Sequence, residues 1–269
     1  MKKYEFTGEA KQVNFEGKTT ILHRIRAIKD FGDVKAGDLG GWIEKEENLS
    51  HESKAWVGSK ACVRDNARVR DNARVRGNAW VGGNARVRGN AYVYGNACVD
   101  GNACVGNNAC VRGDAWVGGS AYIGGDAYVG GDAWVGDNAR VRGDACVGGN
   151  ARVRGKACVG GNAHVGGNAW VGGSARVGNN ACVRGNACVR DNAEILSILH
   201  ILTIGAIGSR NDFTTFYRDK DNQISVSCGC FTGKIEEFLE EVTRTHRDSK
   251  HAQVYRAAVE VAKLQIELN

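Results

Sequence analysis

One histidine, His164, lies within the long repetitive stretch between residues 55 and 195. An imidazole exchanges a proton near neutral pH, so His164 is the candidate general base for any reaction performed there. No inserted loop interrupts the pattern around it to form the wall of a pocket and keep water out. The sequence therefore offers His164 as a catalytic candidate, and an ordinary surface substitution is the simpler interpretation.

A second group of reactive side chains, Cys228, Cys230, His246 and His251, follows the repetitive stretch. Thiolate and imidazole are zinc ligands, but two cysteines separated by a single residue lack the usual spacing of zinc sites. Residues two apart on a strand point to the same face, so we expect both sulfurs to pack into a core. We predict no metal site and no resident cofactor.

Arginine is the most frequent charged residue of the repetitive stretch. Residues 55–196 carry a net charge of +7, against +6 for the whole chain. Guanidinium groups hold phosphates through paired hydrogen bonds, so the arginines predict a surface for a nucleotide, a nucleic acid or another anionic partner, bound in a salt-sensitive way. The alternative is that exposed arginines keep a strand surface soluble. The densest groups are Arg68, Arg70, Arg86, Arg88, Arg140 and Arg142.

The element that must position these side chains is a six-residue repeat, A-x-V-x-G-N. Alanine recurs at every sixth position from Ala55 to Ala193, which gives 24 units without a miss. Two positions after each alanine stands a valine or, twice, an isoleucine. A unit this short suits a parallel β-helix, in which each repeat supplies one short strand and one corner.

Alternation within each unit separates the core from the surface. Alanine and valine point inward, while the residue between them points outward. Glycine, asparagine and aspartate fill the corners, because these residues tolerate the left-handed backbone angles of tight turns. Proline is absent from the chain, as expected where nearly every amide donates to the next coil.

The repeated phrase V-x-G-N-A-x, which covers about half of the chain, resembles the hexads of hexapeptide-repeat proteins. That resemblance implies a left-handed parallel β-helix with three strands per coil, or about eight triangular coils for 24 units. It also implies an acyltransferase that uses acyl-CoA, with an active site between subunits and a histidine on a loop that leaves the helix. This chain retains one histidine in the repeats, His164, but no such loop.

In a three-strand coil, outward residues 18 positions apart form one column. One column contains four of the five tryptophans in the repeats: Trp80, Trp116, Trp134 and Trp170. A flat aromatic wall usually marks a contact surface, so we predict a homo-oligomer that associates through it. The alternatives are coverage by the chain's own terminal segments and stacking of sugars or bases.

Eight of the ten cysteines occupy outward positions of the repeats. Neighbours in a column differ by 18 in residue number, and no pair of these cysteines does. Pairs that share a column differ by at least 36, which places them two coils apart at about 9.6 Å. That separation is too long for a disulfide, so we expect free thiols.

We predict three parts: an N-terminal β cap over residues 1–48, the β-helix over residues 49–196, and a β-hairpin with two helices over residues 197–269. Solenoids need an atypical end to cover their open core. Apolar residues recur at helical spacing from Gly233 to Asp248 and from Lys250 to Leu268. The predicted fold class is therefore mainly β with a C-terminal α+β module.

Segments outside the repeats resemble a group of uncharacterised bacterial and phage hexapeptide-repeat proteins. They are Gly37-Asp-Leu-Gly-Gly-Trp-Ile-Glu near the start, and Gly208-Ser-Arg-Asn-Asp and Ser227-Cys-Gly-Cys-Phe near the end. The resemblance implies a phage or prophage context but no particular reaction. No apolar run is long enough to span a bilayer, so we expect a cytoplasmic protein with no membrane partner.

These patterns together favour a non-catalytic binding or scaffold protein of phage or prophage type. Such a protein self-associates through its tryptophans and binds an anionic partner through its arginines. The alternative is a hexapeptide-repeat acyltransferase, for which CoA is the one cofactor expected. The sequence leaves the question of catalysis open and leans toward none.

Overall fold

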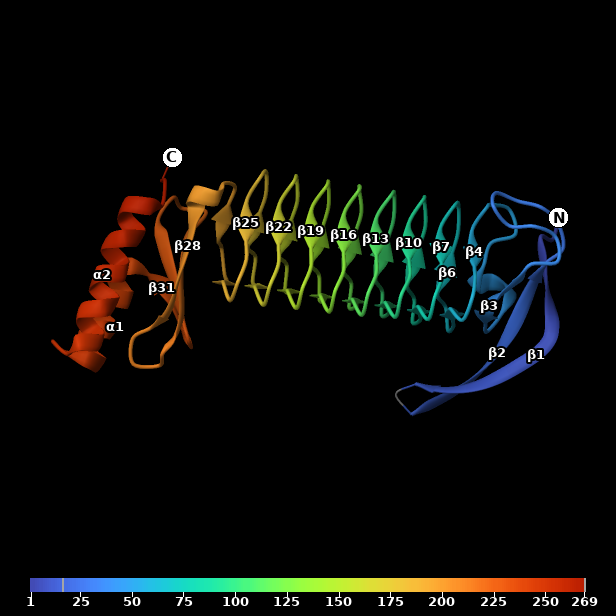
Figure 1. The fold of residues 1–269 in the computed structure, drawn as a ribbon, viewed down its shortest axis with the longest axis horizontal. Coiled ribbons are helices and arrows are strands. Elements are labelled where there is room, and N and C mark those ends of the chain that lie inside the picture. Colours follow the sequence, from blue (N-terminus) through green and yellow to red (C-terminus); the bar gives the residue numbers. More distant parts are fainter. Residues whose placement is uncertain (16, 269) are drawn as a thin grey trace. The chain divides into compact units, whose positions relative to one another are not determined.

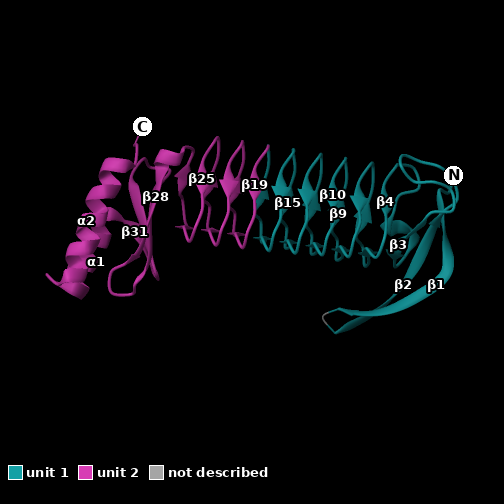
Figure 2. Ribbon diagram, in the orientation of Figure 1, with its two compact units in different colours: residues 1–143 teal, residues 144–269 magenta. Residues whose placement is uncertain are grey.

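The computed structural model describes residues 1–15 and 17–268. They belong to two compact units, residues 1–143 and 144–269 (Figure 2). Each unit contains part of the repeat and one end of the chain. The boundary between the units falls inside the repeat and does not test the predicted boundaries at residues 48 and 196. The division into three parts therefore stays a prediction.

The repeats of unit 1 form fifteen two-residue strands, β4 to β18 (Figure 1). Each pairs in parallel with the strands 18 residues away, as Cys98 does with Trp80 and Trp116. Three strands therefore complete one turn, and outward residues of successive turns form columns.

The fifteen strands make three walls. The tryptophan wall of unit 1 contains β5 (Cys62–Val63), β8 (Trp80–Val81), β11 (Cys98–Val99), β14 (Trp116–Val117) and β17 (Trp134–Val135). The tyrosine wall contains β4 (Trp56–Val57), β7 (Arg74–Val75), β10 (Tyr92–Val93), β13 (Cys110–Val111) and β16 (Tyr128–Val129). The arginine wall contains β6 (Arg68–Val69), β9 (Arg86–Val87), β12 (Cys104–Val105), β15 (Tyr122–Ile123) and β18 (Arg140–Val141).

The core and the corners follow from the residue types of the repeat. The alanines and valines of the repeats are fully buried, and burial of each valine contributes roughly 1.5–3 kcal/mol. Corner residues take left-handed backbone angles; at Gly95, with φ +77°, a Cβ would lie 2.9 Å from the backbone nitrogen of Gly113. Asparagines stack beside these corners, and the amide of Asn72 donates to Asn90 at 2.9 Å.

The segment before the repeats has the predicted strand character. β1 (Tyr4–Phe15) and β2 (Lys18–Ala27) form an antiparallel hairpin, and β3 (Leu39–Ile43) pairs in parallel with β5. After the short 3-10 helix η1 (Glu46–Asn48), Leu49 forms a parallel bridge with Val69. The N-terminal segment thus continues the tryptophan wall by one strand and meets the arginine wall through one isolated bridge.

Unit 2 contains nine short strands, which pair in parallel at the same 18-residue step and form three turns with three walls. They are β19 (Cys146–Val147), β20 (Arg152–Val153), β21 (Cys158–Val159), β22 (His164–Val165), β23 (Trp170–Val171), β24 (Arg176–Val177), β25 (Cys182–Val183), β26 (Cys188–Val189) and β27 (Glu194–Ile195). The parallel three-walled solenoid confirms the predicted parallel β-helix and the number of its repeat strands.

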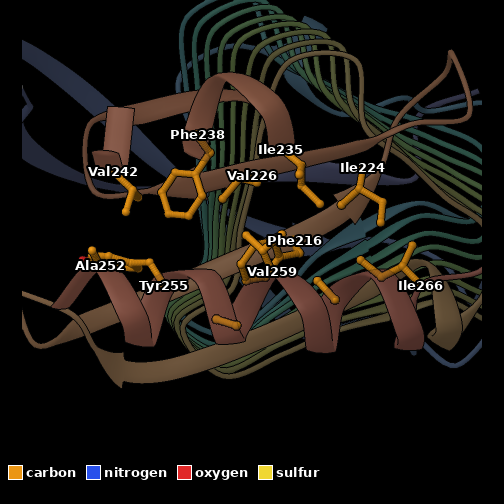
Figure 3. Packing of buried hydrophobic residues seen from close by; sticks show 12 residues of the cluster. Phe216, Ile224, Val226, Ile235, Phe238, Val242, Ala252, Tyr255, Val259 and Ile266 are labelled. Atoms are coloured by element: carbon orange, nitrogen blue, oxygen red, sulfur yellow. The ribbon is translucent and has the colours of Figure 1, made fainter. Parts of the chain in front are cut away.

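The chain after residue 196, here called the C-terminal module, is an antiparallel sheet with two helices. Its elements are η2 (Ile198–His200), β28 (Ile201–Ile207), β29 (Asp212–Arg218), β30 (Ile224–Cys228), β31 (Phe231–Lys234), α1 (Ile235–His246) and α2 (Lys250–Gln265). Figure 3 shows its apolar core, in which Phe216 and Val226 of the sheet face Phe238 of α1 and Val259 of α2. The prediction of a hairpin is incomplete, because β28 and β31 extend the sheet to four strands.

The prediction that Cys228 and Cys230 both pack into a core holds for Cys228, which packs against the apolar core of the module, and is wrong for Cys230. Strand alternation would place both sulfurs on one face, but the strand ends at Cys228, and Gly229 turns the chain with φ +59°. Cys228 is consequently half-buried while Cys230 is exposed. All ten cysteines are free thiols, as the spacing predicts for the eight in the repeats.

No helix within residues 1–15 and 17–268 is long and apolar enough to cross a membrane. Among the same residues, no group of three or more histidine, cysteine, aspartate or glutamate side chains is arranged to hold a metal ion.

Candidate ligand-binding site

Four of the six predicted anion-binding arginines lie together in unit 1. Arg68 and Arg86 are directly paired on neighbouring strands of the arginine wall. Arg70 and Arg88 follow them at the adjoining corner, and all four side chains are exposed. Within the described part of the chain, no side-chain hydrogen bond or ion pair engages any of the four. They present an uncompensated positive patch.

The other two predicted residues, Arg140 and Arg142, are separated from this patch. Cys104 and Tyr122 occupy the two intervening strands of the arginine wall. The sequence therefore predicts one basic row, whereas the structure has a group of four arginines and a more distant pair.

A groove of about 480 Å³ runs over the tyrosine wall of unit 1. A volume of roughly 300–1,000 Å³ is typical of small-molecule sites. Sequence reasoning missed the groove, although its signal was available: the phrases Arg74-Val-Arg76 and Tyr92-Val-Tyr94 are 18 residues apart and therefore stack on neighbouring strands. The lining residues are Arg74, Arg76, Gly77, Tyr92, Tyr94, Gly95 and Cys110.

The arginines of the groove are held in place by the N-terminal segment. Arg74 and Arg76 both form ion pairs with Asp33, and Arg74 also donates to the carbonyl of Lys54 at 2.6 Å. Burial raises the pKa of Asp33, but the hydrogen bond from Arg76 and the two positive charges outweigh it, so the pKa lies below its usual range. Asp33 therefore stays ionised and anchors both guanidinium groups.

The tyrosines of the groove differ in how they are fixed. Tyr92 is 46 % exposed and presents its ring to solvent. The hydroxyl of Tyr94 accepts a hydrogen bond from Arg112 at 3.3 Å, and the same guanidinium lies 4.8 Å from the ring centroid of Tyr128. The groove thus combines one exposed ring, one fixed ring and the accessible side of Arg76, which is 43 % exposed.

His164, the candidate general base, lies on β22 in unit 2 and is half-buried. Burial and, secondarily, the charge of Arg184 lower its pKa, so the imidazole is neutral at pH 7 and able to accept a proton. Its Nδ1 is buried without a hydrogen-bond partner in the described residues. The strands on either side are joined by ordinary corners, so no loop shields His164 from water.

The predicted tryptophan interface is partly covered by the chain itself. Phe15 of the β1–β2 hairpin stacks on Trp80 with ring centroids 6.1 Å apart. Trp116 and Trp134 form a tilted pair with centroids 4.8 Å apart, and Trp116 is 37 % exposed. In unit 2, Trp170 is 39 % exposed beneath the guanidinium of Arg190.

Comparison with known proteins gives partial likenesses. No protein-family profile matches this sequence. A 61-residue segment is 38 % identical to the "Uncharacterized acetyltransferase YdcK" of Escherichia coli strain K12, covering 21 % of this chain and 19 % of that protein. The chain thus spans about a fifth of the length of the curated relative it matches.

A crystal structure from Bacillus cereus, described as a "putative acetyltransferase", aligns with a TM-score of 0.32 and 13 % identity over 54 % of this chain and 74 % of that one. The name of the Escherichia coli relative and the three-walled solenoid fit the predicted resemblance to hexapeptide-repeat β-helix proteins. Neither name refers to a phage.

Proposed function

We propose that this protein is an acyltransferase of the hexapeptide-repeat type, which takes its acyl group from a CoA thioester. The name of the curated relative favours this function over the scaffold role that the sequence patterns alone favour. The observation that carries the proposal is the groove on the tyrosine wall, because it offers aromatic rings and guanidinium groups to the nucleotide end of CoA.

The chemistry of the groove matches a phosphorylated nucleotide. A base stacked on an aromatic side chain gains roughly 1–3 kcal/mol, and the exposed ring of Tyr92 is available for such stacking. A guanidinium group has five N–H donors, so Arg76 retains donors for a phosphate while it is bonded to Asp33. We assign the groove to the adenosine and phosphate part of the acyl donor.

His164, in unit 2, is the candidate general base under this proposal, and it is tested separately from the groove of unit 1 because the two belong to different units. A nucleophilic amine or hydroxyl of the acceptor attacks the thioester carbonyl, and the neutral imidazole accepts the proton that the nucleophile loses. The C–S bond then breaks, the acyl group remains on the acceptor, and the CoA thiolate takes up a proton. The lowered pKa of His164 suits a proton acceptor at neutral pH.

Calorimetric titration of the full chain with acetyl-CoA tests the donor site. We expect saturable binding, and we expect Tyr92→Ala to weaken it at least tenfold. Tyr122→Ala is the matched control, because Tyr122 lies on the arginine wall outside the groove. Equal affinities for the wild type and Tyr92→Ala, or no binding, would contradict the assignment of the groove.

Release of CoA from acetyl-CoA in the presence of amine and hydroxyl acceptors tests the reaction itself. The product is best quantified by mass spectrometry, because the ten free cysteines would react with thiol reagents. We expect His164→Ala to reduce turnover without changing acetyl-CoA affinity. Binding of acetyl-CoA without turnover on any acceptor would leave a CoA-binding protein and exclude the enzyme.

The scaffold role remains the second candidate, because one observation favours it. The Trp116–Trp134 pair is an open aromatic surface in the middle of a regular wall. We propose that a second copy of this chain covers it. This self-association is compatible with acyl transfer and is tested separately below.

A further inference from the structure

A second cavity, of about 280 Å³, lies in the C-terminal module and is independent of the proposed acyl-CoA groove. It forms where the β28–β29 connection and the turn after β30 meet the end of α1 and the first half of α2. Figure 3 shows Phe238, Val242 and Tyr255 at this end of the module's core. Its volume is near the lower end of the roughly 300–1,000 Å³ found for small-molecule sites.

Two glycines allow the cavity to form. Gly208 adopts φ +70°, and a Cβ there would lie 2.0 Å from the hydroxyl of Tyr255. Gly229 adopts φ +59°, and a Cβ there would lie 3.1 Å from Nε of Arg210. Both residues therefore let a functional side chain approach the backbone closely, and substitution of either would displace that side chain.

Three polar side chains meet in the cavity. The hydroxyl of Ser209 lies 3.3 Å from Nε2 of His246, and the imidazole ring stacks on Tyr255 with centroids 5.8 Å apart. Burial raises the pKa of Tyr255, and the neighbouring Cys228 thiol adds to the effect. The Tyr255 hydroxyl therefore stays protonated and able to donate, beside a second hydroxyl and an imidazole.

The cavity takes its positive charge from Arg210. Its one lining carboxylate, Glu241, is already held by Arg244 through contacts of 2.8–3.0 Å and by the hydroxyl of Thr245. In the described part of the chain, no hydrogen bond or ion pair engages the guanidinium group of Arg210. A guanidinium group binds carboxylate or phosphate through two parallel hydrogen bonds, so Arg210 is ready for an external anion.

The remaining wall is apolar. Phe231, Phe238 and Val242 line the side formed by β31 and α1, and Phe231 and Phe238 are in ring contact at 5.4 Å. A ligand that contacts both Arg210 and the apolar wall must carry an anionic group at one end and a hydrophobic body at the other. An inorganic ion would leave the aromatic wall unused.

We propose that this cavity binds a small organic oxyanion, a carboxylate or phosphate monoester attached to an apolar or aromatic body. Arg210 pairs with the anionic group, Ser209 and Tyr255 donate hydrogen bonds to it, and the body lies against Phe231 and Phe238. This proposal does not depend on the proposed function, so it would stand even if CoA did not bind in the groove of unit 1.

The test is a titration of the full chain, followed by imidazole and amide NMR signals, with four probes: phenyl phosphate, phenylacetate, inorganic phosphate and benzyl alcohol. We expect phenyl phosphate or phenylacetate to shift the His246 signals and to bind at least tenfold more tightly than benzyl alcohol. The tighter of the two aromatic anions identifies the anionic group that the site prefers.

Two substitutions in the cavity, at Arg210 and Ser209, and one control outside it, at Lys250, assign the effect to the cavity. Arg210→Gln should remove the advantage of the anion over benzyl alcohol, whereas Lys250→Gln, which removes an exposed cation of the same module outside the cavity, should retain it. Ser209→Ala should weaken anion binding several-fold and checks the result if Arg210→Gln loses its native spectrum. The proposal fails if benzyl alcohol binds as tightly as the anions, if inorganic phosphate matches phenyl phosphate, or if the affinity survives both substitutions.

Discussion

Trp116 and Trp134 are paired on adjacent strands of one wall with ring centroids 4.8 Å apart and an interplanar angle of 55°. The spacing of 18 residues places them there, and the glycines beside them leave room for the rings, because a Cβ at Gly118 would lie 2.7 Å from Trp116 and one at Gly136 would lie 3.0 Å from Trp134. Large aromatic surfaces of this kind dominate interface energetics. The pair is the centre of the self-association that we propose.

The first prediction concerns this pair. Trp116→Ser should raise the dissociation constant of the homo-oligomer by at least about tenfold, because truncation of a central interface tryptophan commonly costs 2 kcal/mol or more. Sedimentation velocity over a range of protein concentrations measures the change. Tyr92→Ser, which removes an exposed ring from another wall, should leave the constant unchanged. A wild-type chain that stays monomeric at high concentration would exclude the interface.

The second prediction concerns the corners of the β-helix. Gly95→Ala should destabilise the chain by roughly 1–3 kcal/mol, because the backbone is left-handed there and the added Cβ would meet Gly113. Gly148→Ala is the control, since a Cβ at Gly148 meets nothing within 4 Å. Urea unfolding followed by circular dichroism measures both. If both substitutions lower the unfolding free energy equally, the left-handed corner at Gly95 does not account for the loss of stability.

Much of this structure follows from the sequence because the repeat is strict. A period of six with alternating burial predicts a parallel β-helix for Ala55 to Ile195. The three-strand coil that the resemblance implies then predicts, at steps of 18, which outward residues are neighbours, as Arg68 and Arg86 are. The free thiols of the eight cysteines in the repeats follow from the same spacing.

The two cavities follow from the sequence only in part. The 18-residue spacing places Arg74 beside Tyr92, but the groove also depends on Asp33, which reaches Arg74 and Arg76 from a segment outside the repeat. The cavity of the C-terminal module depends on the turn at Gly229, which separates Cys228 from Cys230. In both cases the shape of the cavity depends on where a non-repeating segment lies, and the repeat pattern does not predict the position of such a segment.

The third prediction concerns pH. His200 is 8 % exposed, and its Nδ1 accepts a hydrogen bond from the backbone N–H of Leu196 at 3.1 Å. Burial and then the charge of Arg218 lower its pKa, against the opposing effects of Glu194 and Glu267. Protonation therefore favours the unfolded chain, and the stability contributed by neutral His200 is present above the unfolded pKa of about 6.5 and lost as the pH falls.

Unfolding free energies between pH 8 and pH 5 check this prediction. The wild type should lose more stability over this range than His200→Gln, by no more than about 1.4 kcal/mol per pH unit for the one proton. The difference between the two proteins isolates His200, because His51 and His164 also have lowered pKa values and act in the same direction in both. Parallel pH profiles would assign the acid sensitivity to those other groups.

The fourth prediction concerns the positive patch of Arg68, Arg70, Arg86 and Arg88. A single-stranded oligonucleotide that binds there should lose affinity as salt rises, because each phosphate contact contributes roughly 0.7 to the slope of log affinity against log salt. Replacing Arg68 and Arg86 together with glutamine should lower that slope by about 1.4. Fluorescence anisotropy at several salt concentrations measures it.

Arg140→Gln is the control for the patch, because two strands separate Arg140 from Arg86 on the same wall. The control should keep the wild-type slope, because Arg140 lies outside the patch in which four exposed guanidinium groups are concentrated. If the double variant and the control bind alike, the arginines serve to keep the strand surface soluble. Anion binding would then have to be assigned to the groove beneath Tyr92 or to Arg210.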